Sequence, residues 1–396
     1  MQSIFILGGS ALQVPAIKKA KEYGLYVYVL DFNPNAVGIK YADVFLEIST
    51  IDKEEVLKAA EKYKPDFIIT STSDMPVRTV AWVNKKLGKQ NDISYQDALA
   101  ATDKSMMRKR MYDNKVPIPK FYVIENYEEF QKEIENMPQR FVVKPADNSA
   151  SRGVILVDKK EKNNYKGIYD FSKEYSRNGK ILIEEYMEGP EVSVEAITIN
   201  DNTHIISITD KLVTKTPFFV EIGHTEPSRF SNEIQEQIKE VALMAIRAIN
   251  IHNGATHTEI KITEDGIKLV EIAARLGGDF ITSKLVPLST GIDMLDIQFK
   301  IMLNKEIEIK RSVLKGAAIR FLYAHEGMIK SIEEVEEVKN LKGIYEVEMY
   351  KKVGDKVEDL KNSSDRIGHI IAIGKDADEA SQICDEALKK IKINLE

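Results

Sequence analysis

The sequence predicts a mixed fold, with an α/β part at the N-terminus and α+β parts further along the chain. Two observations predict this class. The first hundred residues alternate short apolar strands with amphipathic helices, which is the pattern of a parallel sheet with covering helices. From about residue 100 the pattern changes to helices and hairpin-like strands, which is typical of antiparallel pairs.

The first hundred residues are expected to form three strands and two helices. Apolar runs predict strands at 4–7, 26–30 and 66–70, and amphipathic runs predict helices at 14–23 and 53–63. Ligands of parallel sheets bind at the carboxyl ends of the strands, where glycine and polar residues follow each run. The residues expected around this crevice are Gly8-Gly9-Ser10, Asp31 and Ser71-Thr72-Ser73-Asp74, with Gly9, Ser10, Ser73 and Asp74 as candidate substrate contacts.

The remainder of the chain is expected to form a central and a C-terminal domain. Val116-Pro117-Ile118-Pro119 predicts a stiff connector near the start of this part. We expect domains at 1–100, at 101–310 with a lid-like subdomain at about 115–185, and at 311–396. The expected helices are 103–114, 233–249 and 377–391, and the expected strands are 140–144, 154–157, 181–183, 192–199, a hairpin over 255–275, 317–322 and 368–373.

The composition excludes several classes of function. The chain has 396 residues with 56 basic and 62 acidic side chains, whereas a protein that coats nucleic acid usually has a basic surplus. No apolar run approaches the roughly 20 residues that span a bilayer, and the short N-terminal apolar run lacks a basic region typical of signal peptides. We therefore expect neither a nucleic-acid nor a membrane partner. The single cysteine, Cys384, excludes an intramolecular disulfide and favours the cytoplasm.

The central inference concerns a hairpin that brings two glutamates together. Glu264-Asp265-Gly266 is typical of a three-residue hairpin loop with glycine at a position of positive φ. With that loop Thr263 pairs with Ile267, and counting outward places Glu259 opposite Glu271. Side chains alternate across a strand, so one face is polar and the other faces the core. The expected polar face is His257, Glu259, Lys261, Leu269, Glu271, Ala273 and Arg275, and the expected core face is Ile260, Ile262, Val270 and Ile272.

Two like charges directly opposite each other destabilise a hairpin, so something must offset their repulsion. A divalent cation does so, and hard carboxylate oxygens suit Mg²⁺. Arg275 would add a fixed positive charge beside this metal site. The alternative is a solvated face on which the glutamates pair with Lys261 and Lys268, and a register shift by one residue would remove the metal site.

Further segments carry candidate phosphate- and nucleotide-binding residues. Lys144 ends a strand, and the small hydroxyl-bearing loop 145–153 that follows it can close over phosphates through its N–H groups. The acidic turn 184–191 offers backbone groups to a base and a carboxylate to a ribose, and Lys104 can reach a phosphate from its helix. Taken alone, each of these features, like His224 in its polar loop, is more typical of ordinary structure than of a binding site. No Walker A loop occurs in the chain.

The order of these segments resembles the ATP-grasp superfamily, and within it the carboxylate–amine ligases of the L-amino-acid ligase, biotin carboxylase and glycinamide ribonucleotide transformylase types. Lys104, the Lys144-Pro145 loop, the Glu184-Glu185 turn, Glu259 and the run Glu271-Ile272-Ala273-Ala274-Arg275-Leu276-Gly277-Gly278 carry the resemblance, which covers nearly the whole chain. It implies a Rossmann-like N-terminal domain, an ATP-grasp core of two α+β subdomains and a small C-terminal α+β segment. Ala273 stands where many members have an asparagine metal ligand, which favours the L-amino-acid ligase branch.

The resemblance also implies a role for each candidate residue. Lys104 and Lys144 would contact ATP phosphates, and Arg275 with Lys144 would act in catalysis. Glu259 and Glu271 would ligate Mg²⁺, with Mn²⁺ as an alternative ion. The implied ATP-binding set also includes Ser149, Ser151 and Gly153 in the closing loop and Glu184, Glu185, Met187 and Glu191 around the adenine and ribose. The candidate substrate residues are Gly9, Ser10, Ser73, Asp74, His224, Gly277 and Gly278.

The implied reaction is ATP-dependent joining of a carboxylate, activated as an acyl phosphate, to an amine such as an amino acid. The alternatives are a purine-biosynthesis-type or carbamoyl-phosphate-synthase-like ATP-grasp enzyme, a non-catalytic nucleotide-binding protein and an NAD-dependent oxidoreductase. Gly8-Gly9-Ser10-Ala11-Leu12-Gln13 lacks the G-x-G-x-x-G spacing, which argues against the oxidoreductase. We expect small-molecule substrates and, from the resemblance, a homodimer.

Overall fold

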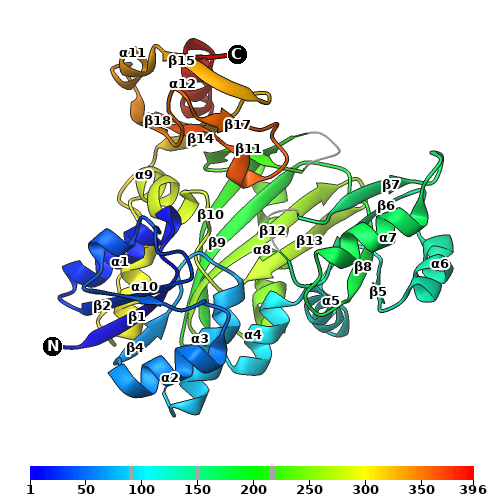
Figure 1. Ribbon diagram of the computed structural model, residues 1–396, viewed down its shortest axis with the longest axis horizontal. Helices are drawn as coiled ribbons and strands as arrows, with labels where there is room; N and C mark the ends of the chain where they lie inside the picture. The colour runs from blue at the N-terminus through cyan, green and yellow to red at the C-terminus, as the bar shows by residue number, and fades with distance from the viewer. Residues whose placement is uncertain (90–91, 149–151, 215–218) are drawn as a thin grey trace.

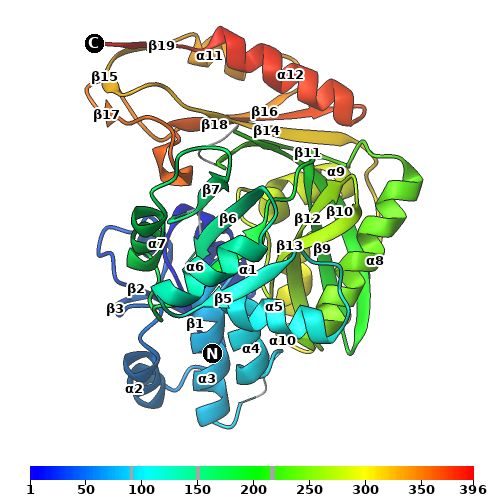
Figure 2. The same cartoon turned by 90° about the vertical axis from the view of Figure 1, so that its right-hand side faces the viewer.

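The computed structural model describes residues 1–89, 92–148, 152–214 and 219–396. Four sheets organise this described part of the chain. In Figure 1 the N-terminal part, a small sheet that begins with β5 and a C-terminal part surround the long strands of a central sheet, and Figure 2 shows the C-terminal part lying across one end of these strands. The mixed α/β and α+β class predicted from the sequence is confirmed, with a parallel sheet at the N-terminus and antiparallel sheets elsewhere.

The N-terminal sheet is parallel and has the strand order β3-β2-β1-β4. Ile4 and Ile6 pack on one face with α1, while Phe5 and Leu7 pack on the other with α2, so β1 is apolar on both faces from Ile4 onward. Strand β3 was not predicted, because this edge strand is short and only partly buried. The elements are β1 Ser3–Leu7, α1 Val14–Glu22, β2 Tyr26–Asp31, β3 Val44–Glu47, α2 Lys53–Tyr63, β4 Phe67–Ile69, α3 Met75–Lys86 and α4 Tyr95–Thr102.

The central sheet is antiparallel and has the order β13-β12-β9-β10-β11-β14-β18-β16. Helix α8, Asn232–Ile249, covers one face, because Ile238, Val241, Ala242 and Ala245 recur at helical spacing and pack in one apolar cluster with the strands. Three strands from the last part of the chain, β14, β18 and β16, extend this sheet, whereas the other three strands of that part form a small sheet of their own. The strands are β9 Glu191–Ile199, β10 Asn202–Val213, β11 Glu221–Glu226, β12 Gly254–Thr263, β13 Gly266–Ala273, β14 Gly316–Leu322, β16 Ile344–Met349 and β18 Gly368–Gly374.

The two remaining sheets lie at the periphery. The small antiparallel sheet β5-β8-β6-β7 has its own core, in which Phe130, Phe141 and Tyr169 pack together. Its elements are α5 Lys104–Asp113, which leads into it, β5 Phe121–Ile124, α6 Tyr127–Asn136, β6 Arg140–Pro145, β7 Ile155–Asp158, α7 Tyr165–Glu174 and β8 Ile181–Glu185. The second peripheral sheet has the order β17-β15-β19, with β15 Gly327–Glu333, β17 Lys356–Val357 and β19 Lys392–Leu395. The helices of the remaining chain are the π-helical turn η3 Ile281–Leu285, α9 Val286–Thr290, α10 Met294–Met302, α11 Val335–Lys339, the short helix η4 Ser363–Asp365 and α12 Ala377–Lys390.

Helix α12 packs on β14 and β18 through a core that contains the buried Cys384. Within the described residues, no helix has both the length and the apolar character needed to cross a bilayer.

The turn between β8 and β9 docks the small sheet onto the central one. Gly189 in this turn has φ +136°, and a Cβ there would lie 2.0 Å from the carbonyl oxygen of Ile262. The Lys261 ammonium donates a 3.0 Å hydrogen bond to the Gly189 carbonyl, and the Ile262 N–H donates one of 3.0 Å to the Pro190 carbonyl. The close approach of the two backbones therefore requires glycine at this position.

We predict that Gly189→Ala lowers the free energy of unfolding by about 2 kcal/mol or more, because both the φ angle and the contact with β12 are incompatible with a Cβ. Urea denaturation followed by circular dichroism measures this. Gly179→Ala is the matched control, since Gly179 also has a positive φ but no atom within 4 Å of the added Cβ. Equal losses in the two variants would contradict the docking role of Gly189.

Candidate active site

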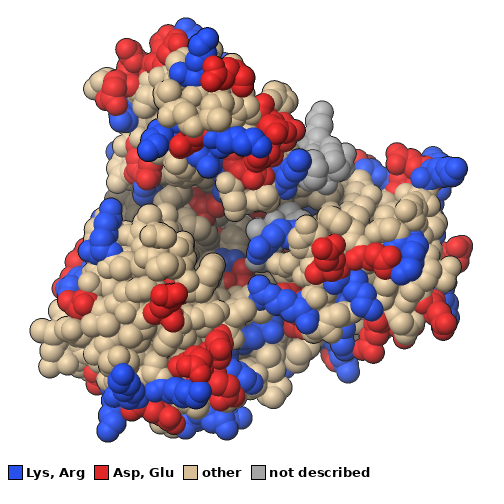
Figure 3. Space-filling model, viewed as in Figure 1, with Lys and Arg blue, Asp and Glu red and all other residues tan. Residues whose placement is uncertain are grey.

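A cavity of about 310 Å³ lies between the small sheet and the central sheet. Figure 3 shows the molecule from the side on which its surface is hollowed between the three outer parts. Charged side chains of both signs line the cavity, and most come from strands. The sequence-predicted residues that line it are Asp74, Lys104, Lys144, Glu184, Glu185, Met187, Glu191, His224, Glu259, Glu271, Arg275 and Gly278.

The hairpin β12–β13 places Glu259 directly opposite Glu271, as predicted, but by a different route. The connection is a two-residue turn that pairs Thr263 with Gly266, not with Ile267. A bulge between Glu259 and Ile260 then shifts the register by one residue and restores the predicted pairing of the glutamates.

The two-residue turn and the bulge also change the expected faces of the hairpin. Leu269 is fully buried in the core beside Ile260 and Ile272, whereas Val270 lines the cavity, so the prediction for Leu269 and Val270 was wrong. The predicted alternation failed there because it assumed an unbroken ladder from the loop to the glutamates.

Each glutamate has a cationic partner in the cavity. The Lys211 ammonium lies 2.9 Å from Glu259 and 2.5 Å from Glu191, and only 3% of its side chain is exposed. Burial opposes its charge, but the carboxylates of Glu191 and Glu259 outweigh burial and hold the pKa of Lys211 well above its usual range. Lys104 lies 2.8 Å from Glu271, and the Glu271 carboxylate likewise outweighs burial and raises the pKa of Lys104.

The alternative in which Lys261 and Lys268 neutralise the two glutamates does not describe the hairpin. Lys261 lies 3.3 Å from Glu191, and Lys268 lies 3.2 Å from Glu185. Glu259 and Glu271 therefore face the cavity together with lysine side chains from other elements. Arg275, which follows β13, points its guanidinium to Asp74 at 2.6 Å and so ties the hairpin to the N-terminal part.

Beneath the cavity, Glu184 is held between two buried cations. Arg108 Nε lies 2.7 Å and Lys144 Nζ 2.6 Å from its carboxylate. Burial alone raises the pKa of Glu184, but the charges of Arg108 and Lys144 lower it to about 2. Burial, together with the charges of Arg108 and Lys104, lowers the pKa of Lys144, so this corner is short of negative charge. An anionic ligand there would stabilise the ammonium of Lys144.

His257 joins the site from the same strand as Glu259. Its Nδ1 lies 2.5 Å from the buried carboxylate of Glu195, and its Nε2 lies 3.4 Å from Glu259. Burial opposes protonation, but Glu195 outweighs it and raises the pKa of His257 to about 9. The alternation of the strand placed His257 on the polar face, so a signal for this residue existed in the sequence.

Two cations of the site gave no usable sequence signal: Lys211, which lines the cavity, and Arg108, which pairs with Glu184. Lys211 belongs to β10, a strand that was not predicted, and Arg108 is one of several basic residues on α5. Only the packing of distant strands and helices reveals that these two cations are buried beside carboxylates. The remaining lining residues that were not predicted include Val142, Tyr186, Val213, Phe219, Glu221 and Asp279.

Several predicted residues do not line the cavity. Asp31 accepts a 2.7 Å hydrogen bond from the Gly9 N–H, and Ser73 accepts one of 2.9 Å from the Gln13 amide, so these residues are engaged by contacts within the N-terminal part. A Cβ on Gly277 would lie 2.7 Å from the Glu195 carboxylate, which makes Gly277 a packing position. Ser10 and Gly153 also lie outside the lining, and Ser149 and Ser151 fall outside the described residues.

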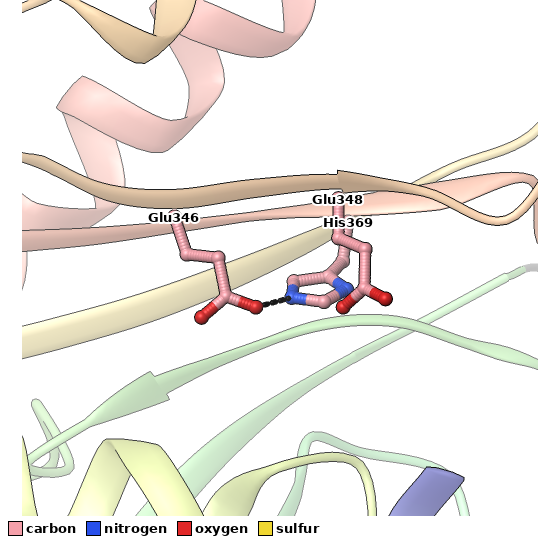
Figure 4. Close-up of side chains that lie close together, drawn as sticks. All are labelled: Glu346, Glu348 and His369. Atoms are coloured by element: carbon pink, nitrogen blue, oxygen red, sulfur yellow. Dashed lines mark ion pairs between the residues drawn. The ribbon is translucent and has the colours of Figure 1, made fainter. Parts of the chain in front are cut away.

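A second group of acidic and imidazole side chains lies apart from the cavity. Figure 4 shows the His369 ring between the carboxylates of Glu346 and Glu348, on the strands β16 and β18. Their ligand atoms all lie within 4.8 Å of one another, so the spacing suits a metal ion. The ammonium of Lys284, however, contacts both oxygens of Glu346. Because this cation already balances the charge of Glu346, we assign no metal to the group.

Two family models match the chain. The model described as ATP-grasp domain matches residues 137–283, which include β6, β8, β9 and the hairpin β12–β13. The model described as L-amino acid ligase C-terminal domain 2 matches residues 320–396.

Individual proteins resemble the chain over most of its length. The L-arginine-specific L-amino acid ligase of Bacillus subtilis is 24% identical over 302 residues, which is 75% of this chain and 72% of that protein. The phosphoribosylamine–glycine ligase of Methanococcus vannielii is 25% identical over 363 residues, covering 79% and 77%. The crystal structure of the L-amino acid ligase from Bacillus licheniformis has a TM-score of 0.84 at 21% identity and covers 100% of this chain and 99% of that one. The chain spans only 57% and 59% of the length of two other curated relatives.

A buried glutamate on β11 makes the stability of this region depend on pH. Glu226 is fully buried and accepts hydrogen bonds from Ser289 at 2.6 Å and Thr209 at 3.2 Å. Burial raises its pKa from 4.5 to about 7. Between these two pH values the unfolded chain has lost the proton and the folded chain keeps it, so the stability of the fold decreases as the pH rises.

We predict that Glu226→Gln removes this decrease, because the amide cannot ionise. Urea denaturation at pH 5 and pH 7.5 measures the effect. The stability lost by the wild-type protein over this interval should exceed the loss in the variant by on the order of 2 kcal/mol. Glu240→Gln, an exposed change on α8, is the control and should behave like the wild type. The same pH dependence in wild type and Glu226→Gln would show that Glu226 is not the group responsible.

Proposed function

This chain belongs to the ATP-grasp proteins and carries an L-amino acid ligase C-terminal domain, and from this premise we propose that it is an ATP-dependent ligase that joins a carboxylate to an amine. The observation that carries the proposal is the pair Glu259 and Glu271, which face each other across β12–β13 in a cavity rich in buried cations. The relatives named above are ligases that form such C–N bonds, and they support an amino acid as one substrate.

The residues present fit a magnesium–nucleotide. Two carboxylates on neighbouring strands supply the hard oxygen donors that Mg²⁺ prefers. Burial and the nearby cations Arg108 and Lys104 lower the pKa of Lys144, so an anion such as a phosphate group would be stabilised beside it. Mg²⁺ held by Glu259 and Glu271 would neutralise charge that develops on transferred phosphate. Mn²⁺ offers the same preference for oxygen donors, and we propose it as an alternative ion.

The proposed reaction has two steps. A substrate carboxylate oxygen attacks the γ-phosphorus of ATP, the bond from that phosphorus to the bridging oxygen breaks, and ADP leaves. The amine then attacks the carbonyl carbon of the acyl phosphate, inorganic phosphate leaves, and the nitrogen loses a proton. Such transfers need positioning and charge neutralisation more than covalent help from the protein.

In this scheme the cationic side chains of the protein bind the phosphate groups. Lys144 contacts the transferred phosphate from beneath the cavity, and Lys104 does so from the start of α5. Arg275 stabilises the acyl phosphate while Asp74 orients its guanidinium. Glu185, Met187 and Glu191 flank the nucleotide, and His224 and Gly278 belong to the part of the cavity left for the other substrate.

The wider proposal includes the organisation of the chain. We assign the N-terminal 1–100 and C-terminal 311–396 domains to enclosing the substrates around the 101–310 core, with 115–185 as its lid. Homodimer formation and a cytoplasmic location complete the proposal; the single buried cysteine supports the latter. A purine-biosynthesis-type ligase is the second candidate, favoured by the match to phosphoribosylamine–glycine ligase over 79% of the chain.

We predict that Glu271→Gln lowers ADP formation by about 100-fold or more, because the amide is a poorer ligand for Mg²⁺ and leaves Lys104 without its carboxylate. Steady-state assays with saturating magnesium measure this, and circular dichroism checks the fold. Glu264→Gln, in the exposed turn of the same hairpin, is the control and should keep wild-type turnover. Turnover within threefold of wild type in Glu271→Gln would refute the metal assignment.

The acceptor class is tested by ADP release from ATP in the presence of pairs of L-amino acids. We predict that at least one pair stimulates release and yields a product whose mass equals the two amino acids less one water. Stimulation by 5-phosphoribosylamine with glycine, and by no amino-acid pair, would favour the purine-type alternative. ADP formation that no acceptor changes would leave only nucleotide binding.

A further inference from the structure

The cavity is too long to be filled by phosphates alone. It is lined by Glu271 on β13 and by Glu221 and His224 on β11, and three strands lie between these two. At the usual spacing of neighbouring strands this corresponds to roughly 15–20 Å. Because the proposed metal and phosphate groups lie at the β13 side, the β11 side is left for the substrate that is not the nucleotide.

The wall at the β11 side is organised by one arginine from the C-terminal domain. Arg366 is 5% exposed and lies between the fold's central sheet and the residues that follow β13. Its Nη1 donates a 2.8 Å hydrogen bond to Oδ1 of Asp279, and its Nη2 donates one of 2.8 Å to Oδ2. Its Nε and Nη2 also donate to the backbone carbonyl of Glu221, at 3.1 and 2.8 Å. Four hydrogen bonds from one planar group therefore fix two lining residues at once.

Further contacts fix the guanidinium itself. Its central carbon lies 3.8 Å from the centroid of the Phe321 ring, so the cation is stacked on β14. Asp279 is in turn 3.3 Å from Nε2 of the buried His224. Arg366 is not among the lining residues, whereas Asp279, Glu221 and His224 are. We therefore expect Arg366 to act on a ligand through these three residues.

We propose that Arg366 is a positioning residue for the non-nucleotide substrate, and that the C-terminal domain completes the substrate end of the cavity through it. The inference rests on the proposed ligase function. Without the guanidinium, the half-buried carboxylate of Asp279 loses its main partner and the polar wall presented to the substrate is no longer fixed. The phosphate end, which is built from other strands, keeps its contacts.

The test compares Arg366→Met with the wild type on the amino-acid pair that supports ADP release. We expect the KM of at least one amino acid to rise by about tenfold or more, with kcat and the KM of ATP within threefold. Arg366→Lys, which keeps the charge but not the fork of donors, should lie between the two.

Lys284→Met is the matched control, because Lys284 also forms an ion pair with the C-terminal domain, at Glu346, but does not line the cavity. Lys284→Met should leave the KM of the amino acid and the KM of ATP unchanged. An equal rise in KM in Lys284→Met, or no rise in Arg366→Met, would overturn the proposal.

A readout without turnover separates this inference from the ligase function. Hydrogen–deuterium exchange on the free protein should be faster in segments 221–226 and 277–281 of Arg366→Met, and unchanged in segment 104–113. If no amino acid supports ADP release, the ligase proposal fails and this exchange result alone decides the role of Arg366. Unchanged exchange in 221–226 and 277–281 would overturn the proposal.

If Arg366→Met does not fold, the double variant Arg366→Met with Asp279→Asn takes its place in both measurements, because the second change removes the carboxylate that is left unpaired.

Discussion

The arrangement of the site depends on one electrostatic constraint, the enforced proximity of Glu259 and Glu271. A hairpin with like charges directly opposite each other is stable only if counter-charges are supplied from elsewhere. The chain supplies Lys211 from β10 and Lys104 from α5, and each belongs to a different structural part. Neutralisation of this pair therefore holds α5 against the central sheet at the cavity.

Other carboxylates near the hairpin are also paired with cations from different parts of the chain. Glu184 gathers Arg108 and Lys144 beneath the cavity, and Asp74 gathers Arg275 from the N-terminal part. These are buried or half-buried pairs, in which removal of one member leaves an uncompensated charge, so they specify how the parts meet more than they add stability. The cations close to these carboxylates would also interact favourably with a ligand that carries several negative charges.

The C-terminal segment is part of this architecture and not an appendage. Its strands β14, β18 and β16 continue the central sheet beyond β11, and Arg366 returns to contact residues that line the cavity. This continuity explains how a domain of only 77 matched residues, 320–396, can influence a site built by strands far earlier in the sequence.

Apolar periodicity and alternation over short distances predicted the parallel N-terminal sheet, more than half of the strands and several of the helices. The facing glutamates were also predicted, although the chain reaches this pairing through a shorter turn and a compensating bulge. The order of motifs indicated Lys104, Lys144 and Arg275 as further residues of the site. The folded structure was needed to show that Val270 and not Leu269 faces the cavity, because a bulge breaks the alternation. It alone revealed Lys211, Arg108 and Arg366, since an isolated lysine or arginine looks the same in a sequence whether it is solvated or buried beside a carboxylate. Such pairings join residues that are tens to hundreds of positions apart, and only chain packing sets those distances.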